Sequence, residues 1–179
     1  MSNPSLPEVW LRGPIEGVPA VLMPAAHAFL QVGEEVAAVA TSLTADELWV
    51  KPGGAASAGF HLQHIVGATD RLLTYARGEA LSDAQKAYLK SEGTPGQPAA
   101  TAESLAAAVQ KSIADAVDVL RRTPAESVTQ ITEARAVGRA ALPTTVLGLL
   151  FHAAEHAQRH AGQLTTTVKI LRGGGTESK

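Results

Sequence analysis

The amino-acid sequence predicts an all-α protein. Alanine is abundant, runs of β-branched residues are short, and four segments repeat apolar residues every three or four positions. This spacing places the apolar side chains of each segment on one stripe of a helix, and each stripe needs a partner that covers it. Four such helices with connections of unequal length predict a four-helix bundle with long crossover connections.

The first predicted helix runs from Pro19 to Leu43. Thr44 follows it and precedes Asp46 and Glu47, an order that is typical of a cap on one further helical turn. The apolar stripe of the first helix consists of Leu22, Ala25, Phe29, Val32, Val36, Val39 and Leu43.

A second helix is predicted after Gly53 and Gly54, which break the chain. Ser57 is suited to cap this helix, and Gly78 ends it. A shorter helix capped by Ser82 follows. The stripe of the second helix consists of Ile65, Ala68, Leu72 and Ala76.

The third long helix opens at Thr101, which is followed by Ser104 and Leu105, and Pro124 lies just beyond its end. Proline is common shortly after a helix because it cannot continue one. The stripe of this helix consists of Leu105, Val109, Ile113, Val117 and Leu120.

The helical pattern weakens between residues 125 and 143, which we interpret as a long crossover. Partial alternation around Val128, Ile131 and Val137 is compatible with extended chain. The last helix then begins at Thr144 or Thr145. Its stripe consists of Val146, Leu149, Leu150, Ala153, Ala157, Leu164, Val168 and Leu171.

The length of 179 residues fits one domain, which we expect over residues 1–172. Residues 173–179 are small and polar and predict a disordered tail. Residues 1–10 lack the basic and apolar regions of a signal peptide, and no apolar run approaches the ~18 residues of a membrane span. We therefore expect a cytoplasmic protein that does not associate with a membrane.

Composition also excludes several classes of function. The net charge is −2, with 15 Lys and Arg against 17 Asp and Glu, and no basic stripe is available for a phosphate backbone. Nucleic acid is therefore not an expected partner. The chain has no cysteine, so a thiolate ligand and a cysteine nucleophile are excluded, and any metal must be bound by His, Asp or Glu.

Three histidines recur at steps of four residues in the last helix, within the stretch FHAAEHAQRHAGQL. A helical wheel places His156 and His160 toward the apolar interior, His152 on the flank and Glu155 toward solvent. Side chains four residues apart are neighbours, so two imidazoles one turn apart can converge on one cation. A third ligand must come from another helix.

The second helix offers His61 and His64 for that position. The wheel places His61 near the apolar centre and His64 toward the edge of the stripe. A helix that is wrapped by core on all sides favours His61, whereas a ligand that faces a cleft can sit at the edge. Periodicity leaves this choice open.

These two segments resemble the metal signature of the DinB-like superfamily. The resemblance covers almost the whole chain. In that family one ligand comes from the second helix and two from the last, the final one standing just before a residue followed by Gly-Gln. The matching segments are His64-Ile65-Val66-Gly67-Ala68 through Leu72, and His156-Ala157-Gln158-Arg159-His160-Ala161-Gly162-Gln163.

The resemblance implies a DinB-like bundle with His64, His156 and His160 as metal ligands. His61 and His152 are alternative or additional ligands, and Gln163 is a residue that can orient a ligand or a bound water. The alternative for any single interior histidine is a hydrogen-bonded core residue.

Other polar residues carry weaker hypotheses. His27 falls opposite the stripe of its helix and is expected at the surface with no role. Glu155 precedes His156, so its order does not match the H-E-x-x-H motif of metalloproteases. Arg135 and Arg139 either bind an anionic substrate near the metal or form surface pairs.

Three neutral imidazoles leave a divalent ion with an open position, as in a catalytic site, and Zn²⁺ or Ni²⁺ suits this set. The resemblance implies a metal-dependent enzyme on a small molecule, either a transferase that uses a low-molecular-weight thiol or a hydrolase. The competing hypothesis is a non-catalytic, metal-stabilised module with a structural or stress-related binding role. Homodimers are common on general grounds, so a second copy is a further expected partner.

Overall fold

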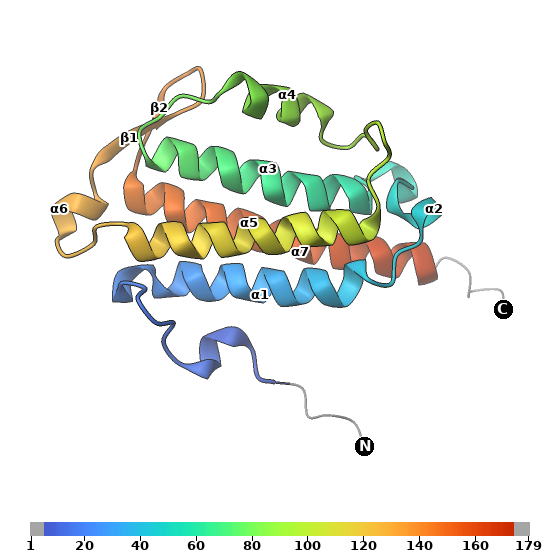
Figure 1. The fold of residues 1–179 in the computed structure, drawn as a ribbon, viewed down its shortest axis with the longest axis horizontal. Helices are drawn as coiled ribbons and strands as arrows, with labels where there is room; N and C mark the ends of the chain where they lie inside the picture. Colours follow the sequence, from blue (N-terminus) through green and yellow to red (C-terminus); the bar gives the residue numbers. More distant parts are fainter. Residues whose placement is uncertain (1–5, 174–179) are drawn as a thin grey trace.

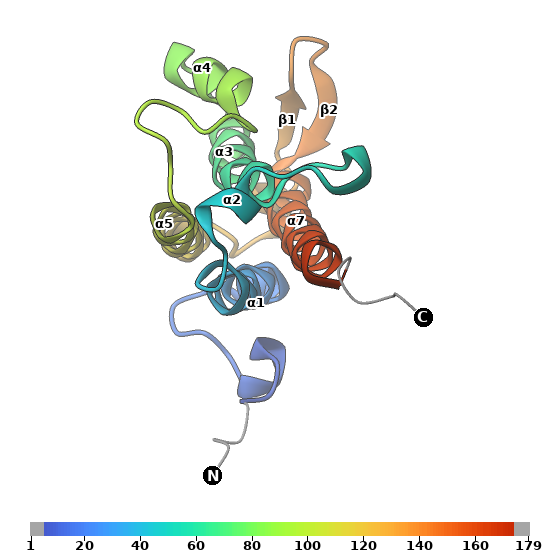
Figure 2. The ribbon, with the colours of Figure 1, turned by 90° about the vertical axis from the view of Figure 1, so that its right-hand side faces the viewer.

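Four long helices dominate the computed structural model, which describes residues 6–173 (Figure 1). Seen nearly end-on in Figure 2, they lie at the corners of a quadrilateral. Helices α1 and α3 do not share a side of it, and each of them packs against both α5 and α7. The four helices are α1 (Met23–Ala40), α3 (Ala58–Ala76), α5 (Ala102–Arg122) and α7 (Val146–Gly173).

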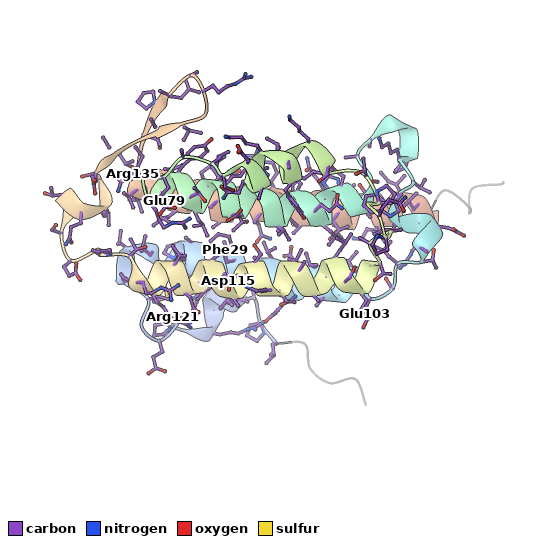
Figure 3. All side chains as sticks on the ribbon, turned by 45° about the horizontal axis from the view of Figure 1, so that its top comes forward. Phe29, Glu79, Glu103, Asp115, Arg121 and Arg135 are labelled. Atoms are coloured by element: carbon purple, nitrogen blue, oxygen red, sulfur yellow. The ribbon has the colours of Figure 1, made fainter. Side chains whose placement is uncertain are left out.

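The apolar stripes of these helices meet in one core, as their spacing predicts. The largest fully buried side chains include Phe29 of α1, Leu62 of α3, Leu120 of α5 and Leu150 of α7. Figure 3 labels Phe29, whose side chain lies in the interior between the helices. Although α7 is 28 residues long, no helix within the described part of the chain combines the length and apolarity needed to cross a membrane.

Shorter helices connect the long ones. They are α2 (Ala45–Leu48), α4 (Asp83–Ser91) and α6 (Val128–Ile131), together with a 3-10 turn at Pro52–Gly54. Two further 3-10 turns, Val9–Arg12 and Ala20–Leu22, precede α1. Thr44, Ser82, Thr101 and Ser127 each cap a helix through a reciprocal capping box, which satisfies backbone N–H groups at its first turn. Helix α4 packs on the outside of α3.

The expectation of an all-α protein is wrong in the crossover before α7. There β1 (Ala134–Val137) and β2 (Leu142–Thr145) form a two-stranded antiparallel sheet, in which Ala134 pairs with Thr145. Gly138 and Ala141 adopt positive φ in the turn between the strands. The extended chain suggested around Val137 is confirmed, whereas Val128 and Ile131 bound α6 instead. The molecule is mostly helical with one small sheet.

Helix ends differ from the predicted ends for local reasons. Helix α1 ends at Ala40, short of Leu43, where the Ser42 hydroxyl donates to a backbone carbonyl of the last turn. Helix α7 begins at Val146 because Thr145 belongs to β2. Gly173 is the last residue of α7 and not the start of the tail, and the rest of the predicted tail, 174–179, lies outside the described residues.

A close contact positions the first turn of α3. A Cβ added at Gly59 would lie 2.6 Å from the ring of Trp49, which follows α2. The ring therefore packs directly on the α3 backbone, which only glycine permits here. This contact lies beside the turn that carries His61 and His64.

Replacing Phe29 with alanine tests the shared core. The lost burial and the cavity left behind are expected to lower the free energy of unfolding by about 3–5 kcal/mol, measured from urea denaturation midpoints. Ile170→Ala on the exposed face of α7 is the control, with an expected change within about 0.5 kcal/mol. Equal losses in both variants would contradict this packing.

Candidate metal centre

Three histidine rings converge where α3 packs against α7. His64 comes from the first half of α3, and His156 and His160 from consecutive turns of α7. One ligand atom from each lies within 4.8 Å of the others. The ring centroid of His160 is 4.5 Å from that of His64 and 4.6 Å from that of His156. The structure therefore brings together the three histidines expected as ligands.

The spacing of the nitrogens fits a divalent cation. Nε2 of His64 and Nε2 of His156 are 3.0 Å apart. Two imidazoles bound to tetrahedral Zn²⁺ at about 2.05 Å would hold their nitrogens about 3.3 Å apart. A small relaxation of either ring therefore accommodates an ion, and all three residues are partly exposed, so solvent can reach the group.

A buried carboxylate sets the tautomer of His64. Nδ1 of His64 lies 2.7 Å from Oε2 of Glu92. A carboxylate only accepts hydrogen bonds, so the ring carries its proton on Nδ1 and donates it to Glu92. The lone pair on Nε2 then points toward the other two histidines. Ligating histidines commonly use their second nitrogen in this way.

His61 contacts the cluster on its buried side. It is buried, and its Nδ1 lies 3.1 Å from Nδ1 of His160. With Nδ1 of His160 occupied by this contact, its Nε2 is left for a cation. Periodicity left the choice between His61 and His64 open. In the structure His64 joins the group of three, and His61 contacts one of its members.

The remaining candidates lie farther from the cluster. His152 is 48% exposed, contacts Glu155 through Nδ1 at 3.1 Å, and has its ring 5.4 Å from that of His156. Glu155 also pairs with Arg159, so it is less solvated than expected. Gln163 is exposed and, among residues 6–173, forms no hydrogen bond with the three histidines. Glu92 and His61, in contrast, each contact a member of the group.

Burial keeps these imidazoles neutral. It lowers the pKa of His156 to about 4 and that of His160 to about 3, with a smaller contribution from the neighbouring His64. Burial likewise lowers the pKa of His61 to about 4. A neutral ring offers a lone pair, which is the form that a metal requires. His156 and His160 therefore offer neutral ring nitrogens at neutral pH.

Sequence reasoning missed two contributors to the site. Phe60 stacks on the ring of His64, with centroids 5.0 Å apart and planes at 14°. Its position four residues before His64 on the same helix was an available signal. Glu92 had no such signal, because it lies 28 residues from His64 in the chain.

One other expectation, for His27, needs correction, and one choice left open, for Arg135, is narrowed by its surroundings. His27 was expected to have no role, but it is partly buried and its Nε2 donates to the backbone carbonyl of Gly13 at 2.9 Å, which ties the N-terminal segment to α1. Arg135 lies at the far end of α3 (Figure 3), where its Nε donates to the Ala76 carbonyl at 2.8 Å. Ala76 is about 18 Å along the helix from His64, so Arg135 does not flank the cluster. Its Nη1 pairs with Glu133 at 2.7 Å, which agrees with the surface pair that was one of the two alternatives. Arg139 is exposed.

Comparison with known proteins identifies the family. Residues 28–164 match the family model of the DinB superfamily, and this range contains His64, His156 and His160. The chain belongs to the DinB superfamily. A DinB-like protein from Bacillus cereus ATCC 10987 has a similar structure, with a TM-score of 0.55 at 20% identity over 84% of this chain and 94% of that chain. This likeness confirms a DinB-like fold. No curated protein matches the sequence.

The metal-free DinB-superfamily chain is expected to lose stability as the pH falls from about 6.5 toward 4. The ordinary histidine pKa is 6.5, whereas burial lowers the pKa of His156 to about 4, so the unfolded chain binds more protons below pH 6.5. Stability from neutral His61, His156 and His160 is complete above that pH and is lost below it.

Urea midpoints of metal-free protein at about pH 7.5 and about pH 5 measure this loss. His160→Gln removes one titrating group and should reduce the difference between the two midpoints. Identical midpoints for the unsubstituted protein would contradict the prediction.

Proposed function

We propose that this DinB-superfamily protein is a metal-dependent enzyme that acts on a small molecule, with His64, His156 and His160 as the metal ligands. The observation that carries the proposal is the pair of Nε2 atoms 3.0 Å apart on two different helices, with the ring of His160 against both. Neutral nitrogen donors, lowered histidine pKa values and partial exposure all support a bound cation.

Zn²⁺ or Ni²⁺ is the proposed cofactor, because both accept imidazole ligands. Three protein ligands leave at least one position for water or substrate. An ion bound there would act as a Lewis acid and lower the pKa of a water or a thiol that occupies this position.

The protein's own residues orient and protect this position. Glu92 holds the ring of His64, and His61 contacts His160 from the buried side. Phe60 covers one face of His64 and excludes water from it.

We favour transfer of a low-molecular-weight thiol over hydrolysis. Within residues 6–173, the group of possible ligands contains histidines and no carboxylate. The carboxylate of Glu92 lies beside it but is engaged by Arg71 and by Nδ1 of His64, so it is not free to act as the base of a hydrolysis. A thiol is more acidic than water and needs less help to form its nucleophile.

We also propose that the long helices form a four-helix bundle with crossovers, as the sequence predicts. Around the bundle, α1 contacts α5, α5 contacts α3, α3 contacts α7 and α7 contacts α1, which supports this topology. The segment with α4 and the segment with α6 and the sheet are then the crossover connections.

Elemental analysis of protein purified without a metal-affinity tag tests the ligands. The unsubstituted protein should hold about one equivalent of Zn or Ni. His64→Ala and His156→Ala should each lose it, because two imidazoles do not complete the site. His27→Ala is the control and should retain the metal, since His27 contacts Gly13 instead. Full retention in a His156/His160 double alanine variant would refute the assignment.

Binding of a thiol tests whether the metal has an open position. With Co²⁺ in place of the native ion, addition of a low-molecular-weight thiol should produce a sulfur-to-metal charge-transfer absorption that saturates with one thiol. The same titration with the His156→Ala variant should give no such band. A Co²⁺ spectrum that no small thiol or anion alters would favour the non-catalytic, metal-stabilised module.

A further inference from the structure

Glu92 is a charged side chain in a place where charge is costly. Its side chain is 2% exposed, at the end of α4. A buried carboxylate requires compensating partners. It has two: Nη1 of Arg71 lies 2.6 Å from Oε1, and Nδ1 of His64 lies 2.7 Å from Oε2. The side chain of Arg71 is itself only 10% exposed.

The segment that carries Glu92 is tied to α3 beside the cluster. The side-chain oxygen of Gln63 accepts from the backbone N–H of Gly93 at 2.8 Å, and its amide nitrogen donates to the Thr94 carbonyl at 3.1 Å. Gln63 immediately precedes His64. The residue next to the proposed ligand therefore holds the backbone next to Glu92.

A glycine on α3 makes room for this arrangement. A Cβ added at Gly67 would clash with Oε1 of Glu92, and would lie 2.7 Å from Nη1 of Arg71 and 2.8 Å from the ring of Tyr88. The carboxylate thus rests against bare helix backbone one turn after His64. Any larger residue at this position would displace Glu92.

The three proposed ligands are supported unequally. His64 has an anionic partner, and His160 has a neutral one in His61. Nδ1 of His156 is buried without a hydrogen-bond partner among the described residues. An anionic acceptor both fixes the tautomer and raises the basicity of the ligating nitrogen, so His64 is the ligand most strongly prepared for a cation.

We propose that Glu92, held by Arg71, is a positioning residue that fixes His64 with its proton on Nδ1 and its Nε2 lone pair free for the metal. This inference rests on the proposed function, in which His64 is a ligand. Arg71 balances the charge of Glu92, so the arrangement is complete before any cation binds. The cation therefore meets a ligand that is already oriented.

The substitution Glu92→Gln gives a sharp test because Arg71 controls how the new amide is oriented. Arg71 only donates, so it will take the amide oxygen and turn the NH₂ group toward His64. Nδ1 of His64 must then accept, which moves its proton to Nε2, the atom needed by the metal. In Glu92→Gln the buried charge of Arg71 has lost its counter-ion. The further substitution Arg71→Met removes that charge and frees the amide oxygen of Gln to accept a hydrogen bond from Nδ1 of His64 again.

Nitrogen-15 NMR of the histidines in metal-free protein reads the tautomer directly. We expect Nδ1–H on His64 in the unsubstituted protein, Nε2–H in Glu92→Gln, and Nδ1–H again in the Glu92→Gln/Arg71→Met double variant. A His64 tautomer that is the same in all three proteins would overturn the inference. This readout is independent of metal binding.

Chelator competition with Zn²⁺ supplies the second readout. Glu92→Gln should weaken binding about 10- to 100-fold, and the double variant should recover part of that loss. Glu155→Gln is the matched control, because Glu155 is one residue from His156 and, within residues 6–173, its side chain bonds to His152 and Arg159 and to none of the three proposed ligands. The dissociation constant of this variant for Zn²⁺ should stay within about twofold. Equal weakening in Glu155→Gln and Glu92→Gln would show a general charge effect and refute the positioning role.

A third variant, Gly67→Ala, tests the position of Glu92 without changing any charged residue. Gly67→Ala should displace Glu92 and weaken Zn²⁺ binding by a similar factor, whereas Gly162→Ala, where an added Cβ meets no atom within 4 Å, should not. If Glu92→Gln fails to fold, the comparison of Gly67→Ala with Gly162→Ala tests the positioning role in its place. If the unsubstituted protein binds no Zn²⁺ or Ni²⁺ but the tautomers change as expected, the proposed function fails while the role of Glu92 toward His64 stands.

Discussion

The close packing of α3 against α7 is the constraint on which the proposed site depends. It brings together imidazoles that are 92 residues apart in the chain and leaves their Nε2 atoms 3.0 Å from each other. On α7, Ala153, Ala157 and Ala161 are buried in the core. Helices α1 and α5 complete the core around this pair. The remaining features of the site orient side chains that this packing has already brought together.

The two kinds of titratable group at the site have different surroundings. Burial lowers the pKa of His156, His160 and His61 and leaves them neutral. Glu92 is nearly inaccessible but pairs with both Arg71 and His64, which compensates its charge. The site therefore combines neutral imidazole nitrogens with the ion pair of Glu92 and Arg71, which contacts His64 on the side away from His156. That combination suits a divalent cation better than a closed apolar core.

The sequence predicted much of the helical structure because the relevant signals are local. Capping at Thr44, Ser82 and Thr101 depends on residues three positions apart, and the structure confirms it. The sheet in the crossover was missed as a sheet, because pairing Ala134 with Thr145 depends on a turn and on the neighbouring α3 and α7. The end of α1 was placed too late, because short hydroxyl side chains bond the backbone there and compete with the helix.

The sequence by itself determined that His156 and His160 share one face of a helix, because a spacing of four residues places them there in any helical chain. It did not determine the third member of the group, since His61 and His64 both lie on the inner half of α3 and differ only in which neighbour they meet. The tertiary structure decided that His64 meets His156 and Glu92 while His61 meets His160. The physical reason is that helix rotation and the docking of the segment after α4 are set by packing between distant residues, which periodicity along one helix does not encode.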